Sequence, residues 1–198
     1  MKTSDFVRCF AVALIGFSGA GPILSPAVAE EPSKEQLDAI RQALEKYQDP
    51  YVAVHDFYLS TVGCVHFDGV KKEGYMDYDK GGMGIHFVNL TLQGPPDPLK
   101  PNVLLYEPDG KKLRLVGAEW LVPLAAAKGH PTLFGQSFHG PMEGHEPLIP
   151  KDFFHYDLHM WLFKDNPLGM FSPTNPDVTC EGADFDLLAE PPKMVPEP

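Results

Sequence analysis

The chain has 198 residues, of which 43% are hydrophobic and 22% charged, a composition typical of a globular protein with a single core and one domain. Its 16 basic and 27 acidic residues give a formal net charge of −11, so neither nucleic acid nor an anionic membrane surface is an expected partner. Because the sequence has no run of 18 apolar residues, we expect no conventional membrane-spanning helix.

The first 29 residues match the pattern of a cleavable signal peptide. Lys2 and Arg8 form a short basic region, residues 9–17 are apolar, and Ala27-Val28-Ala29 matches the small-residue pattern that precedes a signal-peptidase cut. A buried N-terminal helix is the alternative interpretation. We expect cleavage near Ala29 and a mature protein that is periplasmic or secreted.

Export changes the expected state of the cysteines. Of the three cysteines in the chain, Cys9 lies in the predicted signal peptide, which leaves Cys64 and Cys180. An even pair in an oxidising compartment favours a disulfide bond. Two free thiols, or a metal site that includes a cysteine, remain as alternatives.

The mature chain predicts an α+β domain over residues 30–182, with an N-terminal helix packed on a mainly antiparallel β-sheet and one disulfide. Ser33 is a suitable N-cap for a helix over 34–46, in which apolar residues recur at helical spacing, and a second short helix is expected over 51–60. Strand-like composition follows at four places. The expected strands are 85–92, 103–107, 113–123 and 153–163.

Two segments of the mature chain differ from this pattern. Residues 129–150 are rich in Gly, Pro and His and are too long for a simple connection, which favours a functional loop or one ordered by a ligand. Residues 183–198 form an acidic, Pro-rich tail that lacks a core pattern, and we expect this tail to be disordered.

Polar residues fall on strand faces that are otherwise apolar. Alternation along 113–121 places Glu119 on the same face as Leu115 and Leu121, and alternation along 85–92 places His86 beside Val88, Leu90 and Leu92. A buried carboxylate must be protonated, paired with a cation or bound to a metal, because leaving it charged and unpaired is costly.

The expected strand 153–163 also places polar residues together on one face, and it places more of them there. His155, Asp157, His159 and Trp161 share one face, opposite a purely apolar face. A helix would also bring His155 and His159 together, at positions i and i+4. The two imidazoles are therefore expected to converge in either geometry.

These residues predict a site for a divalent transition metal, most simply zinc or copper, with iron and manganese also compatible with the ligand types. The predicted ligands are His86, His155, His159 and Glu119, and Glu119 is alternatively the catalytic base that acts on metal-bound water. His145 in the long loop is a second-tier candidate. The other histidines are expected to be weaker candidates or surface and core residues: His130, His139, His55 and His66.

Two other functions remain open at this point. The protein is alternatively a non-catalytic periplasmic binding domain that recognises a small molecule or a partner through the long loop, with the histidines as a structural cluster. The same His and Glu groups are also suited to acid–base catalysis without a metal. Whether the protein is an enzyme, and whether its chemistry is hydrolytic or redox, does not follow from these patterns.

Several segments resemble a widespread group of uncharacterised exported bacterial proteins. They are Met-Gly-Ile-His-Phe-Val-Asn at 83–89, Leu-Phe-Gly-Gln at 133–136, and His-Tyr-Asp-Leu-His-Met-Trp-Leu-Phe at 155–163, followed by Asn-Pro and Gly-Met-Phe. The similarity covers residues 47–180. It implies an exported bacterial domain in which His86, His155, His159 and Cys180 match the shared pattern. Phe163 departs from it, where a Trp is expected, and so does Lys151-Asp152 before the last motif.

Overall fold

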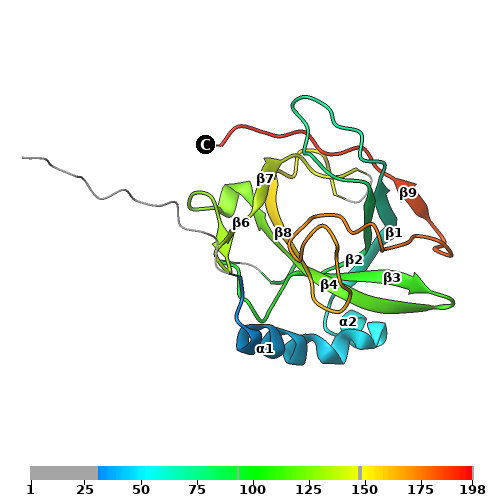
Figure 1. Cartoon of the computed structure of the whole chain (residues 1–198). Helices are drawn as coiled ribbons and strands as arrows, with labels where there is room; N and C mark the ends of the chain where they lie inside the picture. Colours follow the sequence, from blue (N-terminus) through cyan, green and yellow to red (C-terminus); the bar gives the residue numbers. More distant parts are fainter. Residues whose placement is uncertain (1–30, 93, 147–148, 198) are drawn as a thin grey trace, which may run out of the picture.

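The computed structural model describes residues 31–92, 94–146 and 149–197 (Figure 1). The predicted signal peptide, residues 1–29, lies outside the described residues. Within the described ranges, none of the helices combines the length and the apolarity needed to cross a membrane.

Two short helices begin the described chain. Helix α1 (Lys34–Leu44) starts at the predicted N-cap, where Ser33 and Gln36 form a capping box, and a single 3₁₀ turn, η1 (Glu45–Gln48), follows it. Helix α2 (Pro50–His55) begins where the Asp49 side chain accepts a hydrogen bond from the Tyr51 amide. This second helix is shorter than predicted, because the chain enters the first strand at Leu59.

A curled sheet of seven strands forms the rest of the fold, in the order β7-β8-β4-β3-β2-β1-β9 (Figure 1). All neighbouring strands are antiparallel except the β1–β9 pair, which confirms the predicted α+β class. A separate two-stranded hairpin and a 3₁₀ turn, η2 (Leu124–Ala126), lie between β4 and β7. The strands are β1 (Leu59–Phe67), β2 (Gly81–Val88), β3 (Val103–Asp109), β4 (Lys112–Pro123), β5 (Thr132–Leu133), β6 (Gln136–Ser137), β7 (His139–Met142), β8 (His155–Trp161) and β9 (Asp186–Leu188).

The two faces of the sheet bury different kinds of residue. Ile40 and Leu44 of α1 pack into the larger apolar core, together with Trp120, Tyr156 and other large side chains of the sheet. The other face carries a second apolar cluster, which includes Leu105 and Leu121, and the polar residues that the sequence singles out. The candidate site therefore lies on the side of the sheet that the helices do not cover.

Cys64 and Cys180 form the predicted disulfide bond. The bond joins β1 to the segment that precedes β9, across a sequence separation of 116 residues, and both cysteines are buried. A disulfide indicates an oxidising, extracytoplasmic environment for the folded protein.

The prediction of a disordered tail is wrong for much of residues 183–197. Strand β9 pairs in parallel with β1, and Lys193 and Met194 form isolated bridges with Tyr75 and Met142. Strand pairing of this kind uses the backbone of a sheet edge and needs no apolar pattern. Composition therefore failed to reveal this order.

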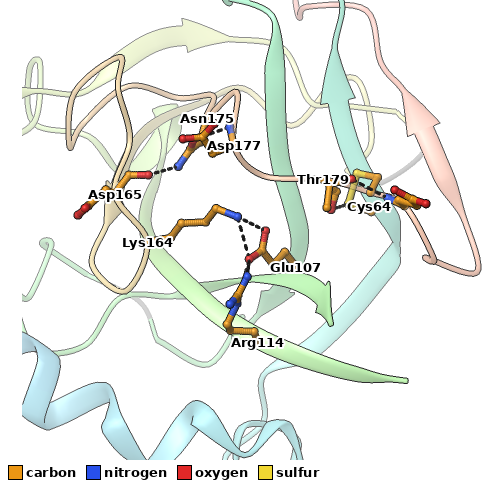
Figure 2. Close-up of polar contacts among 10 residues, drawn as sticks. Cys64, Glu107, Arg114, Lys164, Asp165, Asn175, Asp177 and Thr179 are labelled. Atoms are coloured by element: carbon orange, nitrogen blue, oxygen red, sulfur yellow. Dashed lines mark hydrogen bonds and ion pairs between the residues drawn. A yellow bond between two sulfur atoms is a disulfide. The ribbon is translucent and has the colours of Figure 1, made fainter. Parts of the chain in front are cut away.

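A buried carboxylate on the sheet pairs with two cationic side chains. Glu107 on β3 is fully buried and accepts hydrogen bonds from Arg114 on β4 and from Lys164, which follows β8 (Figure 2). The Lys164 ammonium lies 2.7 Å from the nearer carboxylate oxygen. Because the Lys164 side chain is itself mostly buried, its charge depends on Glu107 for compensation, whereas Glu107 also pairs with Arg114.

Glu107→Gln is expected to lower the free energy of unfolding by about 3 kcal/mol, since it leaves the Lys164 charge without a counter-ion. Chemical denaturation measures the change, and Glu73→Gln, at an exposed position, is the matched control. A loss of under about 0.5 kcal/mol in the Glu107 variant would show that solvent compensates Lys164.

Candidate metal centre

A small cavity lies within the curl of the sheet and contains the residues singled out by the sequence. Its volume is about 20 Å³, which is room for one ordered water molecule. Strands β1, β2, β3, β4 and β8 and the segment after β7 contribute to its walls. The lining residues are Thr61, Val65, Met83, His86, Val88, Val103, Glu119, Leu121, His145, Ile149, His155, Asp157 and His159.

Three donors from three strands meet on one side of this cavity, and we refer to His86, Glu119 and His159 as the Glu119 group. Glu119 on β4 is the direct cross-strand partner of His159 on β8, which places their side chains on the same face. His86 reaches Glu119 from β2, on the far side of β3. Glu119 Oε2 lies 3.5 Å from His86 Nε2 and 3.6 Å from His159 Nε2.

These distances are too long for good hydrogen bonds. Glu119 Oε2 and both ring nitrogens of His159 are buried and have no hydrogen-bond partner among the described residues. Native proteins seldom leave such atoms unpaired, because each costs about 1–3 kcal/mol. Three converging donors that do not bond to one another could hold a metal ion or an ordered water molecule.

Two of the three donor separations in the Glu119 group can be compared with the geometry of metal sites. Bonds of about 2.0–2.1 Å in a tetrahedral zinc site separate neighbouring ligand atoms by about 3.3–3.4 Å, whereas an octahedral arrangement at the same bond length separates them by about 2.9 Å. The measured 3.5 and 3.6 Å are closer to the tetrahedral value.

Burial sets the protonation of this group. Burial, with a smaller contribution from neighbouring histidines, lowers the pKa of His86 to about 3, and burial lowers the pKa of His159 to about 4. Both rings are therefore neutral at pH 7, the form that binds metals. Burial and the nearby charge of Asp157 raise the pKa of Glu119 well above its ordinary value. A cation next to Glu119 would reverse that effect.

A second set of donors lines the same cavity, and we refer to His145, His155 and Asp157 as the Asp157 group. His155 and Asp157 lie on the same face of β8, and His145 follows β7. The donor atoms of the group lie within 4.8 Å of one another. Burial is the main cause that lowers the pKa of His145, to about 3, and it also lowers the pKa of His155. These rings are therefore also neutral at pH 7.

Asp157 connects the two groups. Its Oδ1 lies 3.8 Å from His159 Nδ1 and 3.6 Å from His139 Nδ1, and it has no hydrogen-bond partner by distance and angle among the described residues. Burial alone would raise the pKa of Asp157, but His139 and the other neighbouring histidines outweigh it and hold that pKa below its usual range. Asp157 thus supplies a negative charge between the two sets of imidazoles.

The structure groups the predicted ligands differently from the sequence. His86, Glu119 and His159 converge as expected, but His155 lies with the second-tier candidate His145 in the Asp157 group. Asp157 lies on the histidine face of its strand and belongs to this second group, although it is not among the predicted ligands. His139, a weaker candidate, lies beside it. The other histidines have different neighbours: His130 contacts Glu197, His55 contacts Asp56, and His66 contacts Asp186.

The strict alternation predicted from the sequence is wrong at two places, within β4 and after the end of β2. In β4 the pairing with β3 shifts between Leu105 and Tyr106, which makes Val116 a bulge residue. Leu115 therefore packs in the helix-side core, while Glu119 and Leu121 face the cavity. Strand β2 also ends at Val88, before the two leucines that were expected to share the face of His86.

Acid is expected to destabilise the metal-free protein between pH 6.5 and 4. The pKa values of His86, His145 and His159 are lower in the folded state than the ordinary histidine value of about 6.5, so the unfolded chain takes up protons first and stability falls as the pH falls. Glu119, whose pKa is raised on folding, offsets part of this effect. The expected net slope is at least about 1 kcal/mol per pH unit.

Denaturant unfolding at pH 7, 6 and 5 in the presence of a chelator measures this slope. Asp157, with a lowered pKa, titrates below this window, and His139, with a raised pKa, contributes above it. The exposed variant His55→Gln should keep the wild-type slope. A free energy of unfolding that does not change between pH 7 and 5 would contradict the lowered pKa values of the buried histidines.

The chemistry of the two groups is that of borderline metal ligands: neutral imidazoles with one carboxylate in each group. Comparison of the chain with protein-family models, with curated proteins and with solved structures gives no match in any of the three. By their geometry and ligand types, both donor groups could hold a metal ion.

Proposed function

We propose that this protein is an exported metal-binding protein that holds a divalent transition metal ion, zinc in the first instance, in the Glu119 group. The observation that carries the proposal is the spacing of three converging donor atoms, of which Glu119 Oε2 and His159 Nε2 are buried without a hydrogen-bond partner among the described residues. His86 Nε2 and His159 Nε2 lie 3.5 and 3.6 Å from Glu119 Oε2, beyond hydrogen-bond distance and close to the edge of a zinc coordination tetrahedron.

The ligand set supports zinc over the other candidates. Two histidines and one glutamate are a known set for zinc with an open fourth position. The same set binds iron(II) in octahedral sites, which need shorter separations between ligands, and copper(II) prefers tetragonal geometry. Three protein ligands would leave the fourth position of a zinc tetrahedron to a water molecule.

An ion with an open position would supply an activated water molecule for hydrolysis. Glu119 would act as a ligand in this arrangement and not as the base. The cavity admits only a molecule the size of water, whereas sites for organic ligands have volumes of about 300–1,000 Å³. The geometry thus favours metal binding over recognition of an organic molecule at the histidine cluster, and a reaction on a larger substrate would require the segment that carries His145 to move.

Export to the periplasm or the cell exterior is part of the proposal. The disulfide between Cys64 and Cys180 supports an oxidising compartment, and the signal-peptide pattern before Ala29 supplies the route. In such a compartment a buried site has to retain its ion without the metal buffering of the cytoplasm.

Competition with a chromophoric chelator tests zinc binding by the mature protein. We expect tight binding of zinc by the wild type and an affinity at least about 100-fold lower for Glu119→Gln, because the substitution removes a ligand while keeping its shape. Glu73→Gln, on the surface, is the matched control and should bind as the wild type does. Equal zinc affinity in the wild type and Glu119→Gln would contradict the assignment, as would no binding at all.

A further inference from the structure

The Asp157 group has its own set of donor atoms. His155 donates its Nδ1 proton to the Phe153 carbonyl at 3.1 Å, and because a carbonyl only accepts, the Nε2 of the neutral ring carries the lone pair. His145 Nε2 and Asp157 Oδ1 are both buried and lack hydrogen-bond partners among the residues that the structure describes. One ligand atom from each of the three residues, two imidazole nitrogens and one carboxylate oxygen, lies within 4.8 Å of the others.

Residues next to this group resemble the outer shell of a metal site. The Phe153 carbonyl fixes the orientation and tautomer of His155, and the His139 imidazole lies 3.6 Å from Asp157 Oδ1. Metal-binding histidines commonly donate their second nitrogen to a carbonyl or carboxylate, which fixes the ring and raises its basicity. The His155 ring is held in this way from outside the cavity.

The two groups are neighbours along a single strand. Every second residue of β8 faces the same side, so His155, Asp157 and His159 share one face. Residues two apart along a strand are separated by about 7 Å. Both groups line the same cavity, and Asp157 lies between them, next to the nitrogen of His159 that faces away from Glu119. Ions in the two groups would share this cavity.

We propose that the Asp157 group binds a second divalent transition metal ion, so that the protein holds a two-ion centre in this cavity. This inference rests on the proposed function, because it extends metal binding from the Glu119 group to a second set of ligands. Two cations in one cavity repel each other, so the ions bind in two steps, with the second at least about tenfold weaker than the first.

Cobalt(II), a coloured and paramagnetic probe, tests the proposal through its stoichiometry. Titration of the metal-free mature protein should saturate at two equivalents. His145→Ala should bind one equivalent and keep the zinc affinity of the Glu119 group within about threefold. Glu119→Gln should bind one equivalent in the other group. His55→Ala, at an exposed histidine, is the control and should bind two.

The possible outcomes separate the two proposals. Saturation at one equivalent that Glu119→Gln abolishes and His145→Ala leaves intact would overturn the second ion and leave the proposed function in place. One equivalent that either variant abolishes would indicate a single ion shared by both groups and would also overturn the second site. No binding of cobalt or zinc would overturn both proposals. Circular dichroism of each variant confirms that it remains folded.

Discussion

Zinc at about 1,000 times its dissociation constant is expected to stabilise the metal-free protein by about 4 kcal/mol, which raises the unfolding temperature by about 10 °C. His159→Phe should remove the part of this increase that comes from the Glu119 group and leave only the contribution of an ion bound in the Asp157 group. His159 lies at the junction of the two donor groups, with its Nε2 facing Glu119 and its Nδ1 facing Asp157. A phenyl ring keeps the aromatic shape and removes both donor atoms.

The same variant separates a metal ligand from a structural histidine. Neither ring nitrogen of His159 has a hydrogen-bond partner among the described residues, so replacing it should lower the stability of the metal-free protein by no more than about 1 kcal/mol. A histidine in a hydrogen-bonded core network would cost considerably more. His55→Phe, at an exposed position, should keep the full response to zinc. A zinc-induced increase of the full wild-type size in His159→Phe would show that no ion binds in the Glu119 group.

Removal of the disulfide is expected to have the largest effect on stability. Replacing Cys64 and Cys180 together with alanine should lower the free energy of unfolding by about 5 kcal/mol, because the bond closes a loop with a sequence separation of 116 residues in the unfolded chain. Domains of this size commonly have a total stability of about 5–15 kcal/mol. The loss should be visible as partial unfolding at 37 °C.

Denaturant titration of the double variant, and of the wild type with and without a reductant, measures this contribution. The reduced wild type should lose nearly as much stability as the variant. Because the ligands of the Glu119 group lie on β2, β4 and β8, zinc affinity at low temperature should remain within about threefold of the wild type. A loss of under about 1 kcal/mol would mean that the bond constrains the unfolded chain far less than its span suggests.

Local patterns in the sequence were sufficient for much of the fold. Ser33 and the spacing of Ile40 and Leu44 predicted α1, because capping and helical periodicity depend only on near neighbours. Alternation predicted that His155 and His159 share a face of β8, which the structure confirms. The disulfide followed from the number of cysteines once export was expected.

The division of the ligands between two groups could not be predicted in this way. It depends on the register of β4 against β8, which pairs Glu119 with His159 and leaves His155 near the strand end. It also depends on the segment after β7, which carries His145 to the cavity. The bulge at Val116 is a further non-local feature, because it appears only when β3 and β4 are paired.

Elemental analysis of the mature protein is the most direct test of metal binding. The protein should be purified after export, with no chelator and no affinity-tag histidines, alongside Glu119→Gln prepared in the same way. We expect at least one equivalent of a transition metal per chain, zinc first, in the wild type, and at least one equivalent less in the variant. A wild-type protein that contains no transition metal and takes none up from added zinc would contradict the assignment of His86, Glu119 and His159 as ligands.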